Sequence, residues 1–328
     1  MIFSVLVFSI LCQQGSGARL NKYDRVMEIL KTQGPSACEE AVYAEGDADL
    51  YKFGQNMATV EGRLDDAIIY FVNMARHKKD PVFYFGKAWV HWQKQEVGYA
   101  QEDVIKLINS DANALLKARS HYLLGNIRMQ NHDIDEAFES AEESEKLYQL
   151  LGKNGGLYLA NILKAAIEIK REDYESGIKA IEAAERYNKK IKNPYPKGRS
   201  YELFAEIYFQ QADYEKAISY SNLAKDDYFR SNQDQNAWGM TTRIGLCYAL
   251  LGKYGRAHTI TLEVDAFSKG KKFDRIKIYN YLTIMFLDRC KGLDYQARRS
   301  EILNWINHQS AKSPLRGLFS FVENVSCN

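Results

Sequence analysis

Apolar and small residues along most of the chain recur with the spacing of amphipathic helices. One stretch places four of them on one helical face, at i, i+3, i+4 and i+7: Tyr201, Phe204, Ala205 and Tyr208. The stretch after the next short polar turn has the same spacing: Ala217, Tyr220, Ser221 and Ala224. No stretch shows the alternation of polar and apolar residues that is typical of strands. The pattern predicts an all-α chain built from pairs of helices.

The helix pairs recur with a fixed period. A small residue follows each short turn, and five of these residues are spaced by 40: Ala137, Gly177, Ala217, Ala257 and Ala297. Ala67 and Ala100 precede them at spacings of 33 and 37. A second small residue stands within each first helix, with Met285 in its place in the last unit: Ala88, Gly125, Ala165, Ala205 and Gly245. A fixed period of this size predicts an array of stacked units, in which small residues allow helices to approach closely.

The segment "LLGKYGRAH" from Leu250 contains glycines and a lysine but does not form a phosphate loop. Six residues separate Gly245 from Gly252, and Tyr254 follows Lys253 where that motif requires Ser or Thr. We interpret Gly252 as a helix-ending glycine and Tyr254 as the start of the next helix.

The repeated pattern resembles the tetratricopeptide repeat. The residues that carry the resemblance are Tyr201, Phe204, Ala205, Tyr208, Tyr214, Ala217 and Ala224, with the counterparts Ile244, Gly245, Tyr248, Gly252, Tyr254 and Ala257. The period exceeds the family's usual length of about 34 residues, and the family's Trp and closing Pro are mostly absent. The resemblance implies a right-handed α-solenoid of about seven helix pairs over residues 48–308. It also implies a concave groove, lined by the first helices, that binds a protein or peptide.

The segments outside the repeats have other predicted roles. Residues 1–18 contain an apolar run, "IFSVLVFSILC", that is too short to span a bilayer of about 30 Å and is followed by small residues at Ser16 and Ala18. We predict a signal peptide and a periplasmic or secreted protein. The alternative is a buried N-terminal helix and a cytoplasmic protein. Residues 19–47 are expected to form an N-terminal helical cap, and 309–328, with the run "LFSFV", a C-terminal cap or tail.

Composition excludes some classes of partner and leaves the cysteines open. The net charge is +2, so no strong field favours nucleic acid, and no run is long enough for a direct membrane span. Without the predicted signal peptide, Cys38, Cys247, Cys290 and Cys327 remain, which permits two disulfides in several pairings. Cys247 and Cys290 lie on first helices of adjacent repeats, so a pairing between them is one expectation, but we favour the interpretation of both as small buried residues.

No catalytic constellation is present in the sequence. The six histidines are scattered, and neither an H-E-x-x-H pairing nor a G-x-S-x-G elbow occurs. We therefore predict a protein that is not an enzyme and that needs no cofactor or metal.

The expected groove lies beside the packing face of each first helix. Aromatic residues beside hydrogen-bonding side chains are suited to anchor a peptide. The candidates are Phe85, Trp89, Trp92, Arg119, Tyr122, Asn126, Gln130, Lys170, Arg199, Glu202, Glu206, Phe209 and Gln210. For Trp89 and Trp92, burial between units remains an alternative. Lys52 and Asn56, four residues apart, resemble the clamp with which some family members hold a C-terminal carboxylate.

These patterns predict an exported solenoid that binds a protein or peptide partner as a sensory or scaffolding module. Such a chain is similar to the periplasmic repeat modules of bacterial signalling proteins. The alternative is an intracellular peptide-pheromone receptor without a DNA-binding domain, since residues 1–47 are too short for one. The identity of the partner, the oligomeric state and whether the chain is a piece of a longer signalling protein stay open.

Overall fold

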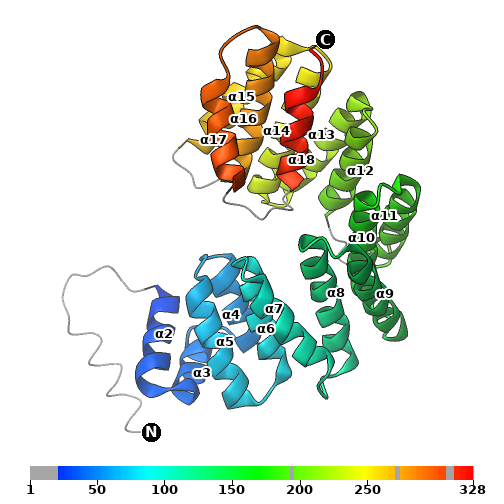
Figure 1. The fold of residues 1–328 in the computed structure, drawn as a ribbon. Coiled ribbons are helices and arrows are strands. Elements are labelled where there is room, and N and C mark those ends of the chain that lie inside the picture. The colour runs from blue at the N-terminus through cyan, green and yellow to red at the C-terminus, as the bar shows by residue number, and fades with distance from the viewer. Residues whose placement is uncertain (1–20, 193–195, 270–273, 308–313, 328) are drawn as a thin grey trace, which may run out of the picture. The chain divides into compact units, whose positions relative to one another are not determined.

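The computed structural model describes residues 21–192, 196–269, 274–307 and 314–327, and in these residues the chain forms 17 helices and no strand (Figure 1). The prediction of an all-α fold is therefore confirmed. The predicted signal peptide lies outside the described residues. Contacts divide the chain into two compact units, residues 1–116 and 117–328, each of which is described by itself.

Unit 1 holds three helix pairs and the first residues of α8. Asn21, Asp49 and Asp80 each accept a hydrogen bond from a backbone N–H at the start of a helix, which explains where α2, α4 and α6 begin. Pro35 and Pro81 occupy the first position of α3 and α6, where a missing N–H costs nothing. The helices are α2 (Lys22–Gln33), α3 (Pro35–Ala44), α4 (Leu50–Thr59), α5 (Leu64–Lys78), α6 (Pro81–Gln93) and α7 (Val97–Ile108).

The core of unit 1 is aromatic and closely packed. Phe53, Tyr70 and Phe71 are fully buried, and the Tyr70 hydroxyl donates to the carbonyl of Leu50 at 3.0 Å. The ring of Phe71 lies against two helical glycines. A Cβ atom would come within 2.8 Å of this ring at Gly54 and within 2.5 Å at Gly86. Both positions therefore require glycine unless the ring moves.

Unit 2 is also built from helix pairs. Each pair has a first and a second helix joined by a short turn, as the repeat predicts. The helices are α8 (Ala114–Gln130), α9 (Ile134–Leu150), α10 (Asn154–Lys170), α11 (Tyr174–Asn188), α12 (Gly198–Gln210), α13 (Tyr214–Arg230), α14 (Asp234–Leu250), α15 (Tyr254–Ser268), α16 (Asp274–Cys290), α17 (Gln296–Asn307) and α18 (Pro314–Asn324).

One turn geometry recurs within the pairs of unit 2. A residue with positive φ appears at the same repeat position five times: His132 (64°), Glu172 (63°), Ala212 (59°), Gly252 (71°) and Gly292 (69°). At one of these turns, the N–H of Ala212 donates to the carbonyl of Phe209 at 3.0 Å and the next N–H donates to the carbonyl of Tyr208 at 2.9 Å. These bonds form the Schellman motif, which satisfies the last carbonyls of the first helix. The interpretation of Gly252 as a helix-ending glycine is confirmed.

The small residue after each turn packs where two helices cross. It is the fourth residue of its helix and is buried at six of the seven positions: Ala67, Ala100, Ala137, Gly177, Ala217 and Ala257. Ala297 is the exception, because it is exposed. The turn before α17 spans residues 291–295, whereas the turn before α15 spans only 251–253. Ala297 is therefore the second residue of its helix, and the expectation that it occupies the repeat's packing position is wrong.

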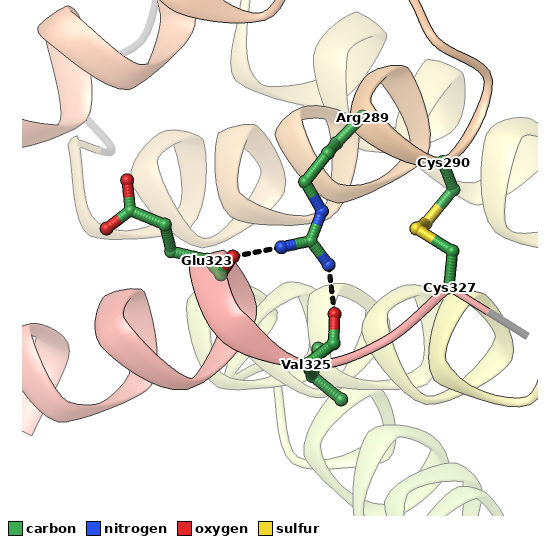
Figure 2. The surroundings of a disulfide bond; sticks show 5 residues. All are labelled: Arg289, Cys290, Glu323, Val325 and Cys327. Carbon is green, nitrogen blue, oxygen red and sulfur yellow. Dashed lines mark hydrogen bonds between the residues drawn. A yellow bond between two sulfur atoms is a disulfide. The ribbon is translucent and has the colours of Figure 1, made fainter.

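The C-terminal residues return to the end of α16. Cys290 forms a disulfide with Cys327, and Arg289 donates hydrogen bonds to the carbonyls of Glu323 and Val325 (Figure 2). The interpretation of Cys290 as a simple buried residue is therefore wrong, because α18 brings Cys327 back to it. Cys247 is a buried free thiol, as interpreted, and burial raises its pKa to about 12. Cys38 is also a buried free thiol.

Among the described helices, none combines the length and the apolar character that a bilayer crossing requires.

Candidate functional site

Charged side chains gather on the first helices of unit 2. Arg199 pairs with Glu202 at 2.9 Å (Nη1 to Oε2), and Arg243 of α14 forms an ion pair with Glu206 of α12. Tyr228 of α13 completes the group, because its hydroxyl donates to Glu202 Oε2 at 2.6 Å. We call these five residues the charged cluster. Two neighbouring first helices and the second helix between them therefore contribute to one site.

The periodicity of α12 explains why three of these residues share one side of the helix. Arg199, Glu202 and Glu206 follow one another at i, i+3 and i+7, which is one helical stripe. The residues on the opposite sides are buried in the stack: Ser200, Leu203, Ala205 and Ile207. The charged stripe thus remains available to solvent and ligands, with 44% of the Arg199 side chain, 25% of Glu202 and 26% of Glu206 exposed.

The cluster keeps both carboxylates ionised. Burial alone would raise the pKa of Glu202, but the charge of Arg199, the hydrogen bond from Tyr228 and the charge of Arg243 outweigh it and lower the pKa to about 2. Burial also opposes ionisation of Glu206, and here the charge of Arg243 and the hydrogen bond from Gln210 lower the pKa. The charge of Glu202 raises the pKa of Arg199 against the effect of burial. The site therefore presents fixed charges of both signs at neutral pH.

Residues of two further first helices influence the cluster through their charge or dipole. Tyr122 of α8 interacts electrostatically with Arg199, and Lys170 at the end of α10 does so with Glu206. Tyr122 is half-buried and packs against a core that contains Ala137 and Leu163. The structure thus brings together three residues that the sequence indicated, Arg199, Glu202 and Glu206, and places Tyr122 and Lys170 within electrostatic influence of them.

The other predicted residues of unit 2 are placed as follows. Arg119 and Gln130 are exposed on α8. Asn126 is half-buried, and its side-chain amide donates to the carbonyl of Tyr122 at 2.8 Å. Gln210 is exposed and donates to Glu206 Oε1 at 2.9 Å. Phe209 is half-buried and contacts the ring of Phe321 in α18, with 6.4 Å between ring centroids.

The predicted residues of unit 1 do not form a comparable surface. Phe85 is only 9% exposed, so the expectation that it is a free anchor is wrong. The physical reason is that α6 contacts α4, α5 and α7, which leaves little of its surface free. Trp89 is half-buried against the core of unit 1, so the alternative of burial applies to much of its ring. Trp92 is also half-buried, Asn56 is half-buried and Lys52 is exposed.

Sequence reasoning missed two members of the cluster. Arg243 stands in α14, where the only other charged residue is Asp234 in the first turn. An arginine whose helix carries only one other charge, in its first turn, is a signal in the sequence, because the arginine's charge needs a partner on a neighbouring helix. Tyr228 gave no such signal, since it lies on a second helix among other packing residues and is 3% exposed.

In the part of the chain that the structure describes, no three or more His, Cys, Asp or Glu residues come together in a way that could hold a metal ion.

Comparison with solved structures identifies the fold. A tetratricopeptide repeat protein from Parabacteroides merdae matches with a TM-score of 0.53 and 11% identity, covering 84% of this chain and 98% of that chain. The apo form of the quorum sensor NprR from B. thuringiensis matches with a TM-score of 0.58 and 14% identity, covering 85% and 83%. No protein-family model and no curated protein matches the sequence. The chain shares the fold of tetratricopeptide repeat proteins, as the sequence resemblance predicted.

Proposed function

We propose that the chain is a non-enzymatic binding protein that holds a peptide, or an extended segment of a protein, on the first helices of unit 2. The observation that carries the proposal is the charged cluster, which is fixed by internal ion pairs and yet 20–44% exposed at its four charged side chains. The shared fold also supports it, because tandem repeats of this kind present continuous binding surfaces.

The chemistry of the cluster suits a peptide backbone. A guanidinium has several N–H donors, so Arg199 can bind a ligand carbonyl or carboxylate while it keeps its pair with Glu202. Glu206 provides an acceptor for a ligand N–H. Tyr122 adds an aromatic ring, which is a common anchor for a ligand side chain. Donors, acceptors and one apolar surface together match the repeating polar groups of a peptide and its side chains.

The test uses peptides selected from a random display library on the parent protein. Truncation of an anchor typically costs 2 kcal/mol or more, so Tyr122→Ala and Arg199→Ala should each weaken a selected peptide by about 30-fold. Arg199→Ala should change the melting temperature little, whereas Tyr122→Ala should also lower it, because the Tyr122 ring packs against the core that contains Ala137 and Leu163. Arg230→Ala is the matched control, because Arg230 lies on the second helix α13 with 74% of its side chain exposed. Selected peptides that bind both site variants and the control equally well would exclude the cluster as the site.

An exported, sensory or scaffolding role is the form of this function that we favour. The disulfide between Cys290 and Cys327 supports export, because disulfides persist mainly in oxidising compartments. The second candidate is a peptide-pheromone receptor, which is favoured by the shared fold of NprR, a quorum sensor. The intact mass of the protein from its host separates the two, since loss of residues 1–18 requires export and their retention favours the receptor.

A further inference from the structure

The C-terminal helix α18 lies against the first helices of the array. Arg289 and Cys290 of α16 occupy the same repeat positions as Phe209 and Gln210 of α12, two repeats later. Arg289 through its hydrogen bonds and Cys290 through its disulfide hold the end of α18 (Figure 2). The ring of Phe321 in α18 contacts Phe209 of α12. Helix α18 therefore contacts the same stripe of the first helices that carries the charged cluster on α12.

The polarity of this stripe changes from one helix pair to the next. The position of Glu206 on α12 is taken by Leu246 on α14 and by Phe286 on α16. Leu246 is 4% exposed and Phe286 is 1% exposed, and both belong to the hydrophobic cluster that contains Phe319 and Val322 of α18. At this position the stripe is thus charged on α12 and apolar on α14 and α16, which share a core with α18.

Helix α18 makes the contacts that an amphipathic ligand helix makes in a groove. Phe319 and Val322 are buried at i and i+3, whereas Ser320 and Asn324 are exposed. Arg289 donates to carbonyls at the C-terminal end of α18, where a cation is favourable because those carbonyls lack partners within the helix. Apolar contacts, a capped helix end and a charge pair between Arg299 and Glu323 together hold α18.

We propose that the first-helix stripe of α14 and α16 is a docking site for an amphipathic helix, that α18 is its resident occupant, and that the Cys290–Cys327 disulfide controls exchange with a partner helix. The partner has the chemistry of α18: an apolar face, an acidic residue near its C-terminal end and free terminal carbonyls for Arg289. The inference rests on the proposed function, because it names a kind of partner for the same row of first helices.

The exchange begins with a thiol–disulfide reaction. A dithiol reductant is oxidised to its disulfide, and the Cys290–Cys327 bond accepts two electrons and two protons to give two thiols. While the bond is intact, the end of α18 is held beside its site at a high effective concentration, and a partner cannot compete. After reduction, the backbone still tethers α18 to the array, but its C-terminal end is held only by non-covalent contacts, so a partner helix can compete for the site.

The test places a synthetic peptide of residues 316–327, with its cysteine activated as a mixed disulfide, on the full-length Cys327→Ser variant. Docking brings the peptide's cysteine next to Cys290, so Cys290 should be labelled at least about 10-fold faster than by a control peptide with Phe319→Asp and Val322→Asp. Mass spectrometry of the digested protein locates the label and quantifies its rate. Amide hydrogen exchange should show faster exchange in α18 of the variant, with α14 and α16 still protected.

Equal labelling rates for the two peptides would overturn the inference, because they show thiol exchange without docking. An α18 that stays protected and a Cys290 that neither peptide labels would also overturn it, because α18 is then a permanent part of the core. If the variant does not fold, the parent protein reduced with dithiothreitol provides a second sample for amide hydrogen exchange alone, because the reductant and the free Cys327 would both remove a peptide bound to Cys290. The proposed function is tested separately, since display-selected peptides that still depend on Arg199 leave it standing when the docking inference fails.

Discussion

The repeated turn of unit 2 allows a sharp test of the repeat's backbone geometry. Ala212 and Gly292 occupy the same left-handed turn position, with φ of 59° and 69°. A residue with a Cβ pays about 1–2 kcal/mol for this conformation, whereas glycine does not. Glycine loses about 0.4–1 kcal/mol more than alanine in backbone entropy on folding. The difference predicts that Ala212→Gly stabilises the folded state, and Gly292→Ala destabilises it, each by about 0.5–1 kcal/mol.

The local surroundings remove the main competing explanations. A Cβ at Gly292 would meet no atom within 4 Å, so Gly292→Ala adds only the conformational strain. Gly255 is the matched control, because it is also exposed and uncrowded but is the second residue of α15, outside the left-handed region. Gly255→Ala should therefore stabilise the protein by about 0.4–1 kcal/mol.

Urea unfolding followed by circular dichroism measures the three variants. Stacked units can unfold in steps, so amide hydrogen exchange in the flanking helices should accompany the midpoints. The reasoning predicts opposite signs for the two Gly→Ala variants. If Gly292→Ala and Gly255→Ala both stabilise the protein, the left-handed turn does not exist in solution.

Two further predictions concern packing and charge. Ala217→Leu and Ala257→Leu should overpack fully buried positions and cost on the order of 1–3 kcal/mol, while Ala297→Leu, exposed at the corresponding sequence position, should melt like the parent. Equal melting temperatures for all three would show that the packing position is wrongly placed. Because the folded-state pKa of Glu202 is about 2, below its value of about 4.3 in an unfolded chain, its contribution to stability is complete above pH about 4.3 and is lost as the pH falls toward 2. The pKa difference sets an upper limit of about 3 kcal/mol on the contribution of Glu202 to the free energy of unfolding, and solvent screening reduces this contribution. Glu202→Gln should therefore weaken the fall in stability between pH about 4.3 and about 2. An unchanged pH dependence of stability would contradict the lowered pKa.

The repeat was predictable from the sequence because its signals are local. Small residues at a fixed period and the helix-ending Gly252 are direct consequences of close helix packing and of a left-handed turn. The same turn at Glu172 and Ala212 could not be predicted, because those residue types rarely adopt positive φ. The misplacement of Ala297 has a similar cause, since nothing in its local pattern shows that the turn before it is two residues longer.

The candidate site was predictable only within one helix. Helical spacing placed Arg199, Glu202 and Glu206 on one stripe, and the structure agrees. Contacts between neighbouring helix pairs depend on which helices surround a side chain, and that information is absent from a local pattern. The burial of Phe85 and the approach of Arg243 to Glu206 are both of this kind. The pairing of Cys290 with Cys327 also depends on the path of α18.

Comparison of equivalent repeat positions distinguishes residues that stabilise the helix pairs from residues that serve the candidate site. The same stripe position holds Glu206 on α12, Leu246 on α14 and Phe286 on α16, in helices of the same class. The helix pair therefore forms without a charge at this position. A partly buried ion pair adds little stability over well-packed apolar residues, because the desolvation of both charges offsets their attraction. The pair between Glu206 and Arg243 is thus not explained by the stability of the array, and it is the best candidate for a contact that serves a ligand.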